Sequence, residues 1–391
     1  MASTSEKYIP ETPAELTPDW LTRALTANGV LNGQRVVEAT SQVLGEGEGF
    51  LGDILRLRLR YDEPVEGAPA SVIAKLPKLA NRGMGELLGA YERENCFYME
   101  FGQRLPVRTP RMYYGDFDRD PASEKQEEIM QVADQLPKFL INPMTALARW
   151  IAGRKKRRYI LLLEDITDAA SGDQVAGADI SRCIETLNTI ARAHAAFWAE
   201  PELSNQFWLL PLNIDTRMRH SMFRKSTPAF TRMFQTEMDQ GLATYMQTVE
   251  EQGVEMMRTL CEAPTTLLHC DLRLDNLFFD EDGVIVFDWQ LVRRGPAAYD
   301  VAYFLSGALD EHAGAGDIDL LLAAYHEALS ASGVTDYALA DLQRDYRLAL
   351  HNVLQSLATI DQVDLGDGRG IPLMRSWIRR LHARLRAADA Q

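Results

Sequence analysis

The spacing of apolar residues predicts a first half that is rich in strands. Residues 53–61 alternate Leu and Arg with a period of two, which is typical of a strand with one buried and one exposed face. Residues 71–74 and 159–163 are short apolar runs with β-branched members, and they predict two further strands. One helix is expected to begin at Pro18, directly after a Thr N-cap, and another to cover residues 91–101.

Helical periodicity dominates after about residue 170. Apolar residues from Ile180 to Trp198 recur every three or four positions and predict one long helix. Thr227-Pro228 predicts the start of another helix, and two more are expected over residues 317–332 and 337–360. The exception is Asp282-Gly283, which lies between two short apolar runs and predicts a β-hairpin.

These patterns predict an α+β protein of two domains. A β-rich N-terminal domain is expected over residues 1–168, with an insertion at about 119–158. A mostly helical domain is expected over residues 169–391. Strands gathered in one part of the chain and helices in the other are typical of this fold class.

Composition and charge narrow the function. The chain has 391 residues, with 41 Lys plus Arg against 56 Asp plus Glu and a net charge of −15, which argues against a nucleic-acid partner. No apolar stretch reaches about 18 residues, so no transmembrane segment is expected, and the N-terminus does not resemble a signal peptide. The four Cys are scattered without a C-x-x-C pair, which argues against a zinc site and fits a reducing compartment. The expectation is a soluble, cytoplasmic protein.

A glycine motif precedes the alternating strand. Gly47, Gly49 and Gly52 form a G-x-G-x-x-G sequence. A dinucleotide-binding fold requires a helix directly after such glycines, whereas here a strand follows, so a nicotinamide-dependent oxidoreductase is disfavoured. A loop laid over nucleotide phosphates fits better. A simple Gly-rich hairpin turn is the alternative.

A lysine ends the second apolar strand. Lys75 follows Val72-Ile73-Ala74, and Glu94 lies nineteen residues later on a predicted helix. A glutamate in that position could pair with the lysine and hold it towards phosphates. Taken without Glu94, a lysine that reaches solvent is the simpler interpretation.

The most specific motif is His269-Cys270-Asp271-Leu272-Arg273-Leu274-Asp275-Asn276, an H-x-D-x-x-x-x-N sequence. A loop of this length can aim the Asp271 carboxylate at an attacking hydroxyl and the Asn276 amide oxygen at a metal ion bound to a nucleotide. Twelve residues further, the apolar run Val284–Phe287 ends at Asp288, a second oxygen ligand for the same metal.

These motifs, in this order, resemble the aminoglycoside phosphotransferase and choline kinase superfamily of protein-kinase-like enzymes. Within it, the chain is most similar to the ecdysteroid-kinase-like and related bacterial phosphotransferases. The resemblance covers roughly residues 40–360. It is carried by the 269–276 loop, by Ile285–Gln290 with Tyr299–Ala302, and by the segments 94–98, 161–165 and 191–198.

The resemblance implies a bilobal fold that binds ATP and Mg²⁺ between its lobes, and it implies a role for each matching residue. Asp271 would orient the substrate hydroxyl and accept its proton. Asn276 and Asp288 would hold Mg²⁺. The nucleotide would be bound by the backbone of the glycine loop, by Lys75 positioned by Glu94, and by a hinge at Glu164, Asp165 and Ile166. His269 would be architectural, and Asp300 would brace the catalytic loop.

Departures from the protein-kinase pattern favour a small acceptor over a peptide. Cys270 stands where regulated protein kinases carry an arginine, and only about a dozen residues separate Asp288 from Asp300, too few for a peptide-docking segment. Arg273, two residues after Asp271, could neutralise charge on the transferring phosphoryl group. An outward, solvated arginine is the alternative for this residue.

Two regions bear on the acceptor. The basic run Arg154–Arg158 follows a short amphipathic segment and could receive an anionic ligand or a membrane surface, or could simply complement a helix dipole. Seven of the 14 Met lie between Met218 and Met257, which suggests an apolar acceptor pocket, with ordinary helix core as the alternative. His194 is expected to be a hydrogen-bonded core residue.

The sequence therefore predicts an ATP- and Mg²⁺-dependent kinase that phosphorylates the hydroxyl of a small-molecule alcohol, with an apolar acceptor preferred. The same chemistry on a hydroxyacyl-CoA, a choline-like alcohol or an aminoglycoside is the nearer alternative. A nucleotide-binding pseudokinase is the remote one, since all four motif positions that such proteins commonly lose are present.

Overall fold

The structure of the protein is a computed structural model that describes residues 8–44, 52–78, 82–137, 140, 143–144, 147, 150–152, 154, 156–359 and 368–389. The chain divides into two compact units. The first comprises Met1–Arg104, Thr109–Pro121 and Ala146–Asp168, and the second comprises Leu105–Arg108, Ala122–Thr145 and Ala169–Gln391. The segment that the sequence suggested as an insertion in the N-terminal domain is therefore divided between the two units.

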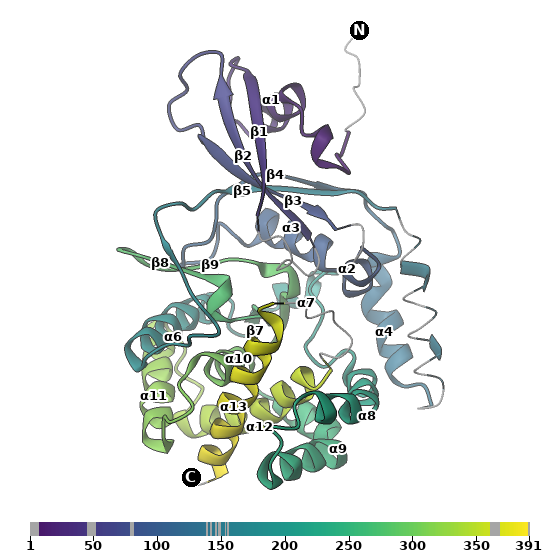
Figure 1. Ribbon diagram of the computed structural model, residues 1–391, viewed down its shortest axis with the longest axis vertical. Coiled ribbons are helices and arrows are strands. Elements are labelled where there is room, and N and C mark those ends of the chain that lie inside the picture. The colour runs from purple at the N-terminus through teal and green to yellow at the C-terminus, as the bar shows by residue number, and fades with distance from the viewer. Residues whose placement is uncertain are drawn as a thin grey trace. The chain divides into compact units, whose positions relative to one another are not determined.

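The first unit contains a five-stranded antiparallel sheet (Figure 1). In spatial order its strands are β1 (Val36–Leu44), β2 (Gly52–Tyr61), β3 (Ser71–Pro77), β5 (Tyr159–Glu164) and β4 (Met112–Phe117). The alternation in β2 acts as predicted, because Leu55 and Leu57 are buried while Arg58 and Arg60 are exposed. The sheet thus keeps one apolar face for a core.

Helices complete this unit. They are α1 (Pro18–Ala27), α2 (Arg82–Leu88) and α3 (Ala90–Glu100), preceded by a 3₁₀ turn, η1 (Pro13–Glu15). The predicted N-cap of α1 is present: the Thr17 hydroxyl accepts a hydrogen bond from the Trp20 amide at 3.3 Å. Trp20, Leu21 and Leu25 pack on the apolar face of the sheet. Burial of such side chains stabilises each by about 1.5–3 kcal/mol relative to exposure.

The second unit is mostly helical. Its helices are α4 (Gln126–Asp134), α6 (Ile180–Ala195), α7 (Glu202–Asn205), α8 (Thr216–Met233), α9 (Gln240–Leu260), α10 (Ala298–Ala308), α11 (Ala315–Ala331), α12 (Leu339–Leu357) and α13 (Gly370–Asp389). Helix α6 packs against α11, and α12 packs against both α9 and α10 (Figure 1). The sheet followed by this helical region confirms the predicted α+β class.

Short strands and turns frame the region of the H-x-D-x-x-x-x-N motif. One small sheet pairs β7 (Thr265–Leu268) with β10 (Arg293–Pro296), and another orders β6 (Ala170–Ser171), β8 (Leu277–Asp280) and β9 (Gly283–Val286). Three 3₁₀ turns also occur in this unit: η2 (Ser123–Lys125), η3 (Leu274–Asn276) and η4 (Trp289–Leu291). The predicted hairpin at Asp282-Gly283 is confirmed as the turn between β8 and β9.

One helix start was predicted wrongly. Pro228 does not begin a helix but lies inside α8, which begins at Thr216. Proline removes one backbone donor from the helix ladder, yet Phe223 and Phe230 are fully buried on either side of it. The Thr227 hydroxyl also donates to the Phe223 carbonyl at 2.8 Å. Packing on both sides of the proline thus maintains the helix through it.

No helix in the described part of the chain is long and apolar enough to cross a membrane. The two long helices expected near the C-terminus are present as α11 and α12, each with bounds within a few residues of the prediction.

Candidate functional site

Asp300 organises the loop that follows β7. Its carboxylate, at 0% exposure, accepts hydrogen bonds from the backbone amides of His269 at 2.6 Å and Cys270 at 2.9 Å. Cys270 has a left-handed backbone with φ of 62°, a conformation that costs a non-glycine residue free energy unless its surroundings impose it. The two amide contacts impose it, so the expectation that Asp300 braces this loop is confirmed.

His194 supports Asp300 from α6. Its Nε2 lies 3.3 Å from Asp300 Oδ2, and its Nδ1 lies 2.8 Å from the hydroxyl of Tyr325. Both residues are fully buried. The prediction of a hydrogen-bonded core histidine is therefore confirmed, with the added finding that its partner is the carboxylate behind the loop.

His269 fixes the path of the loop rather than facing a reactant. Its Nε2 lies 2.9 Å from the carbonyl oxygen of Phe287, which can only accept, so Nε2 carries the proton. Its Nδ1 then accepts a hydrogen bond from the Asp271 amide at 3.2 Å. With both ring nitrogens engaged by backbone, His269 is architectural, as expected.

The Asp271 carboxylate is held by three side chains from different places. Tyr303, on α10, donates its hydroxyl to Oδ1 at 2.9 Å. Asn276 donates Nδ2 to Oδ2 and to the Asp271 carbonyl, both at 2.9 Å. The Nε of Arg273 lies 3.5 Å from Oδ1. One carboxylate is thus oriented on both of its oxygens before any ligand arrives.

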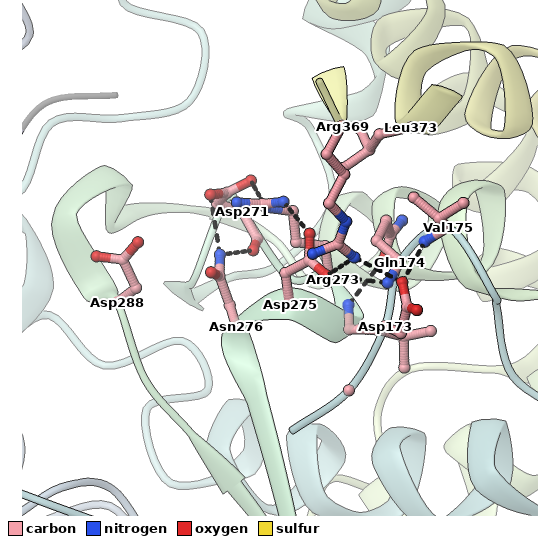
Figure 2. A network of polar contacts seen from close by, with 12 residues as sticks. Asp173, Gln174, Val175, Asp271, Arg273, Asp275, Asn276, Asp288, Arg369 and Leu373 are labelled. Carbon is pink, nitrogen blue, oxygen red and sulfur yellow. Dashed lines mark hydrogen bonds and ion pairs between the residues drawn. The ribbon is translucent and has the colours of Figure 1, made fainter. Parts of the chain in front are cut away.

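Arg273 is part of a network and not an outward, solvated side chain (Figure 2). Its Nη1 donates to Asp275 Oδ2 at 2.7 Å. Burial lowers the pKa of the Arg273 guanidinium, but the charges of Asp271, Asp275 and Asp288 oppose this effect, and the pKa lies above its usual value. The arginine therefore stays charged beside Asp271.

The same network connects the loop to the C-terminal helix (Figure 2). Arg369, just before α13, donates Nη2 to Asp275 Oδ1 at 2.8 Å and to Asp173 Oδ1 at 2.5 Å. Gln174 adds two contacts: its amide donates to Asp275 at 2.9 Å and its side-chain oxygen accepts from the Leu274 amide at 2.8 Å. Two segments distant in the sequence, 173–174 and Arg369, thereby fix the turn that carries Asn276.

Asn276 and Asp288 supply oxygen atoms suited to a hard cation. Because Asn276 Nδ2 donates to Asp271, the amide is fixed in orientation, and its Oδ1 accepts no hydrogen bond from the residues that the structure describes. Asp288 has φ of 65° and ψ of 59°, a left-handed backbone that is uncommon for aspartate. Carboxylate and amide oxygens are typical Mg²⁺ ligands, so the donor set fits this ion.

In the first unit, the predicted contact between Lys75 and Glu94 is present. Lys75 Nζ lies 2.6 Å from Glu94 Oε1, and the side chains are 17% and 8% exposed. Lys75 comes from β3 and Glu94 from α3. An ion pair this far removed from water holds the ammonium in one place, since a buried charge without its partner is costly.

The glycine motif is only partly within the described residues. Gly47 and Gly49 lie outside them. Gly52 is the first residue of β2, and a Cβ built on it would approach the Leu76 carbonyl oxygen to 3.2 Å, a close contact that favours glycine there.

The segment predicted as a hinge follows β5, and its acidic side chains are engaged inside the first unit. Glu164 accepts a hydrogen bond from the Arg111 amide at 3.1 Å. The Asp165 carboxylate is 2% exposed and binds Arg56 at 2.7 Å and the Ser71 hydroxyl at 2.6 Å. Ile166 is partly exposed. The Asp165 side chain therefore joins β2 to β3, which leaves the backbone of this segment for the predicted nucleotide contact.

The basic run Arg154–Arg158 is likewise partly used inside the first unit. Arg157 is 12% exposed and pairs with Glu92 at 2.8 Å, and Arg158 pairs with Asp118 at 2.8 Å. These two residues do not form an open anion-binding surface, so the expectation is wrong for them.

The exposed part of this segment is smaller. The Arg154 guanidinium stacks 3.6 Å from the centroid of the Trp150 ring, and the Trp150 side chain is 55% exposed. Lys156 is exposed as well. A cation over an indole face is stabilised by about 0.5–1 kcal/mol at exposed sites.

Residues 46–333, more than half of the chain, match the Ecdysteroid kinase-like family. The chain belongs to this family. The resemblance seen in the sequence is thereby confirmed, and with it membership of the superfamily of small-molecule kinases. No curated protein matches the sequence.

A solved structure with a TM-score above 0.5 shows the fold of this Ecdysteroid kinase-like protein. The GDP complex of wild-type aminoglycoside 2'-phosphotransferase-IIIa has a TM-score of 0.51 at 14% identity, over 94% of this chain and 98% of that chain. Amicoumacin kinase, in complex with AMP-PNP and Ca²⁺, has a TM-score of 0.49 at 10% identity, over 88% of each chain. Choline kinase from Cryptosporidium parvum has a TM-score of 0.46 at 9% identity, over 96% of each chain.

The sequence analysis did not predict two contacts of this loop, that of Tyr303 with Asp271 and that of Arg369 with Asp275. Tyr303 lies three residues after Asp300 on α10. Because residues three apart share a helix face, the position of Asp300 indicated that Tyr303 could also contact the loop. Arg369 carried no such signal. It lies about a hundred residues from Asp275, outside any motif, and only the folded chain brings the two together.

Proposed function

We propose that this protein is an ATP- and Mg²⁺-dependent kinase that transfers the γ-phosphoryl group to a hydroxyl of a small-molecule alcohol. The observation that carries the proposal is the fixed Asp271 carboxylate, oriented by Tyr303 and Asn276 at 2.9 Å and flanked by Arg273. A base for phosphoryl transfer needs this kind of positioning more than it needs unusual basicity. Family membership and the fold support the same reaction class.

In the proposed reaction, an oxygen–phosphorus bond forms between the acceptor hydroxyl and the γ-phosphorus. The bond from that phosphorus to the β,γ-bridging oxygen breaks, and ADP leaves. Asp271 accepts the hydroxyl proton. Arg273, held beside Asp271 by Asp275, contributes positive charge near the transferring group.

The nucleotide would be bound by the residues that match the motifs of the family. Lys75, positioned by Glu94, would contact the α- and β-phosphates, and the backbone that includes Gly52 would cover them. Glu164 to Ile166 would contact the base through the backbone, since the Asp165 side chain is engaged elsewhere. Asn276 and Asp288 would hold Mg²⁺, which neutralises phosphate charge when bound.

The proposed acceptor is a small-molecule alcohol. An apolar alcohol is the first candidate, and a hydroxyacyl-CoA, a choline-like alcohol and an aminoglycoside are alternatives. The Met cluster gives the apolar candidate only partial support: Met246 and Met257 are buried core residues and Met233 is 40% exposed. Arg154 and Lys156 remain candidates for an anionic group of a ligand or for a membrane surface.

The test is ADP release with MgATP against a panel of sterols, terpenoid alcohols, hydroxyacyl-CoAs, choline and aminoglycosides. Asp271→Ala should abolish acceptor-dependent turnover while MgATP affinity, measured by calorimetry, stays within about threefold. Lys75→Met is the matched variant and should weaken MgATP binding instead. Loss of MgATP binding in folded Asp271→Ala would contradict the role given to Asp271. Tight MgATP binding without turnover on any alcohol would favour the pseudokinase.

A further inference from the structure

A cavity of about 370 Å³ lies between α8 and α9, within the second unit. Its lining is dominated by cationic and polar side chains: Arg217, His220, Ser221, Arg224, Lys225, Glu250 and Val254. We call this the cationic pocket. None of the seven methionines between Met218 and Met257 lines it, although α8 and α9 carry most of them.

The lining follows from the sequence of α8. Its five lining residues occupy positions 217, 220, 221, 224 and 225, which is the spacing of one helix face. The 18 residues of α8 include five Arg or Lys and no Asp or Glu. In a chain with a net charge of −15, such a helix concentrates positive charge on one surface.

Among the described residues, only part of the positive charge of the pocket is paired with a carboxylate. In the part of the chain that the structure describes, neither Arg217 nor Lys225 forms an ion pair with a carboxylate. Arg217 donates one N–H to the Asp134 carbonyl at 2.9 Å and keeps the remaining donors of its guanidinium. Glu250, the only carboxylate among the lining residues, lies 3.1 Å from Arg224, with both side chains about half exposed.

The inner end of the pocket is held in place by close helix packing. His220 is 7% exposed, and its Nδ1 lies 3.5 Å from Gln355 Oε1 on α12. Gly253 on α9 permits this approach: a Cβ at that position would lie 2.8 Å from Gln355 Oε1 and 3.3 Å from His220 Nδ1. A glycine inside a helix is less favourable than alanine, and here it permits the packing behind the pocket.

We infer that the cationic pocket binds a small molecule that carries a phosphate or carboxylate group. Guanidinium and ammonium groups form charge-assisted hydrogen bonds with such anions, and the Ser221 hydroxyl adds a further donor. The volume is within the range of pockets for small organic ligands. Val254 provides an apolar wall for the part of the ligand that is not charged.

The anionic group has two conceivable sources, a distal part of the phosphoryl acceptor or a separate ligand. The contacts at the start of α8 favour the phosphoryl acceptor as the source. Asp215, directly before α8, binds Arg293 at 3.1 Å, and Arg293 follows Asp288 by five residues in the sequence. To this extent the inference builds on the proposed function. Anion binding by the pocket itself does not require that function.

The direct test is calorimetric titration of the full-length protein with inorganic phosphate and, separately, citrate, in saturating MgADP. The wild type should bind at least one of them saturably. Arg217→Gln/Lys225→Gln should weaken that binding at least tenfold. Arg232→Gln removes the same charge from the same helix outside the pocket and should change it less than twofold. Equal weakening by Arg232→Gln, or unchanged binding in the double variant, would overturn the inference.

Two further measurements keep the result interpretable. Lys225→Gln alone, at an exposed position, should give a several-fold effect and serves if the double variant does not fold. MgATP affinity of the variants reports on the nucleotide site, so that failure of the pocket and failure of the proposed kinase can be told apart. Unchanged MgATP binding with weakened phosphate or citrate binding supports the pocket.

The source of the anion follows from kinetics with an active acceptor. If the acceptor carries the anion, the double variant raises the KM for that acceptor at least tenfold with little change in kcat, and phosphate competes with it. If a separate ligand binds, the KM is unchanged and phosphate binds equally well with the acceptor present. Both results support an anion site, whereas a lower kcat at unchanged phosphate affinity would contradict it.

Discussion

The loop around Asp271 and the cationic pocket both depend on charged side chains of the second unit, but they differ in how those charges are balanced. Around the loop, Asp300 accepts hydrogen bonds from two backbone amides, and Asp271 accepts hydrogen bonds from Tyr303 and Asn276. In the pocket, Arg217 and Lys225 are without carboxylate partners among the described residues.

This difference indicates how each region responds to a ligand. A network whose members are already paired is preorganised, so a reactant meets groups that need not move. A pocket whose cationic side chains outnumber its carboxylates is stabilised when an anion enters it. Disturbing the loop should therefore lower turnover or stability without any added anion. Disturbing the pocket should matter only when an anion is present.

Asp300→Ala is expected to have the largest effect. It removes the acceptor of the His269 and Cys270 amides in a fully buried place, and each unsatisfied buried donor costs about 1–3 kcal/mol. We expect the free energy of unfolding to fall by about 3 kcal/mol and turnover to be lost. Urea unfolding and ADP release measure the two effects.

Asp336→Ala is the control for this change, since Asp336 is exposed on the same unit. It should alter stability by less than about 0.5 kcal/mol. If Asp300→Ala behaved like this control in unfolding, the loop would not depend on the buried carboxylate.

Tyr303→Phe is expected to have an intermediate effect. It deletes the hydroxyl that donates to Asp271 Oδ1, and a hydrogen bond to a charged group contributes about 1.5 kcal/mol. This corresponds to roughly a tenfold lower kcat, while the KM for MgATP should stay unchanged. Burial and the Asp271 charge raise the pKa of Tyr303 well above its usual value. Wild-type kcat should therefore show no loss from Tyr303 ionisation up to about pH 10.

Tyr337→Phe provides a matched comparison. Tyr337 also donates its hydroxyl to a buried carboxylate, at 2.7 Å, but this carboxylate is Asp345 on α12 and not Asp271. It should lower stability without lowering kcat. A similar fall of kcat in both variants would mean that Tyr303 acts through general stability and does not position Asp271.

The sequence predicted those parts of the site that depend on neighbours along the chain. The alternation in β2, the turn at Asp282-Gly283 and the spacing from Asp271 to Asn276 are local patterns, and the structure contains each of them. The pairing of Lys75 with Glu94 was also predicted, because strand and helix contexts were both recognisable.

The parts that were missed depend on packing between distant segments. Local propensity predicts a helix start at Pro228, whereas burial of Phe223 and Phe230 continues the helix through it. The methionines of α8 suggested an apolar acceptor pocket. The basic face of that helix becomes a pocket only where α9 packs beside it, which periodicity in one segment does not reveal.

Arg369→Gln should give the smallest effect, and it tests whether the loop depends on its contact with the C-terminal part of the chain. Arg369 joins Asp275 and Asp173 at the rim of the loop, but its side chain is 37% exposed. Exposed ion pairs contribute about 0–1 kcal/mol, so stability should change by less than about 0.5 kcal/mol. If the contact positions the turn that carries Asn276, kcat should still fall two- to threefold and the Mg²⁺ dependence of turnover should shift to higher concentration. Arg379→Gln, on α13, breaks a surface ion pair with Glu311 and should change neither. Identical kinetics for the two variants would show that the loop is fixed by Gln174 and Asp300 without help from the C-terminal helix.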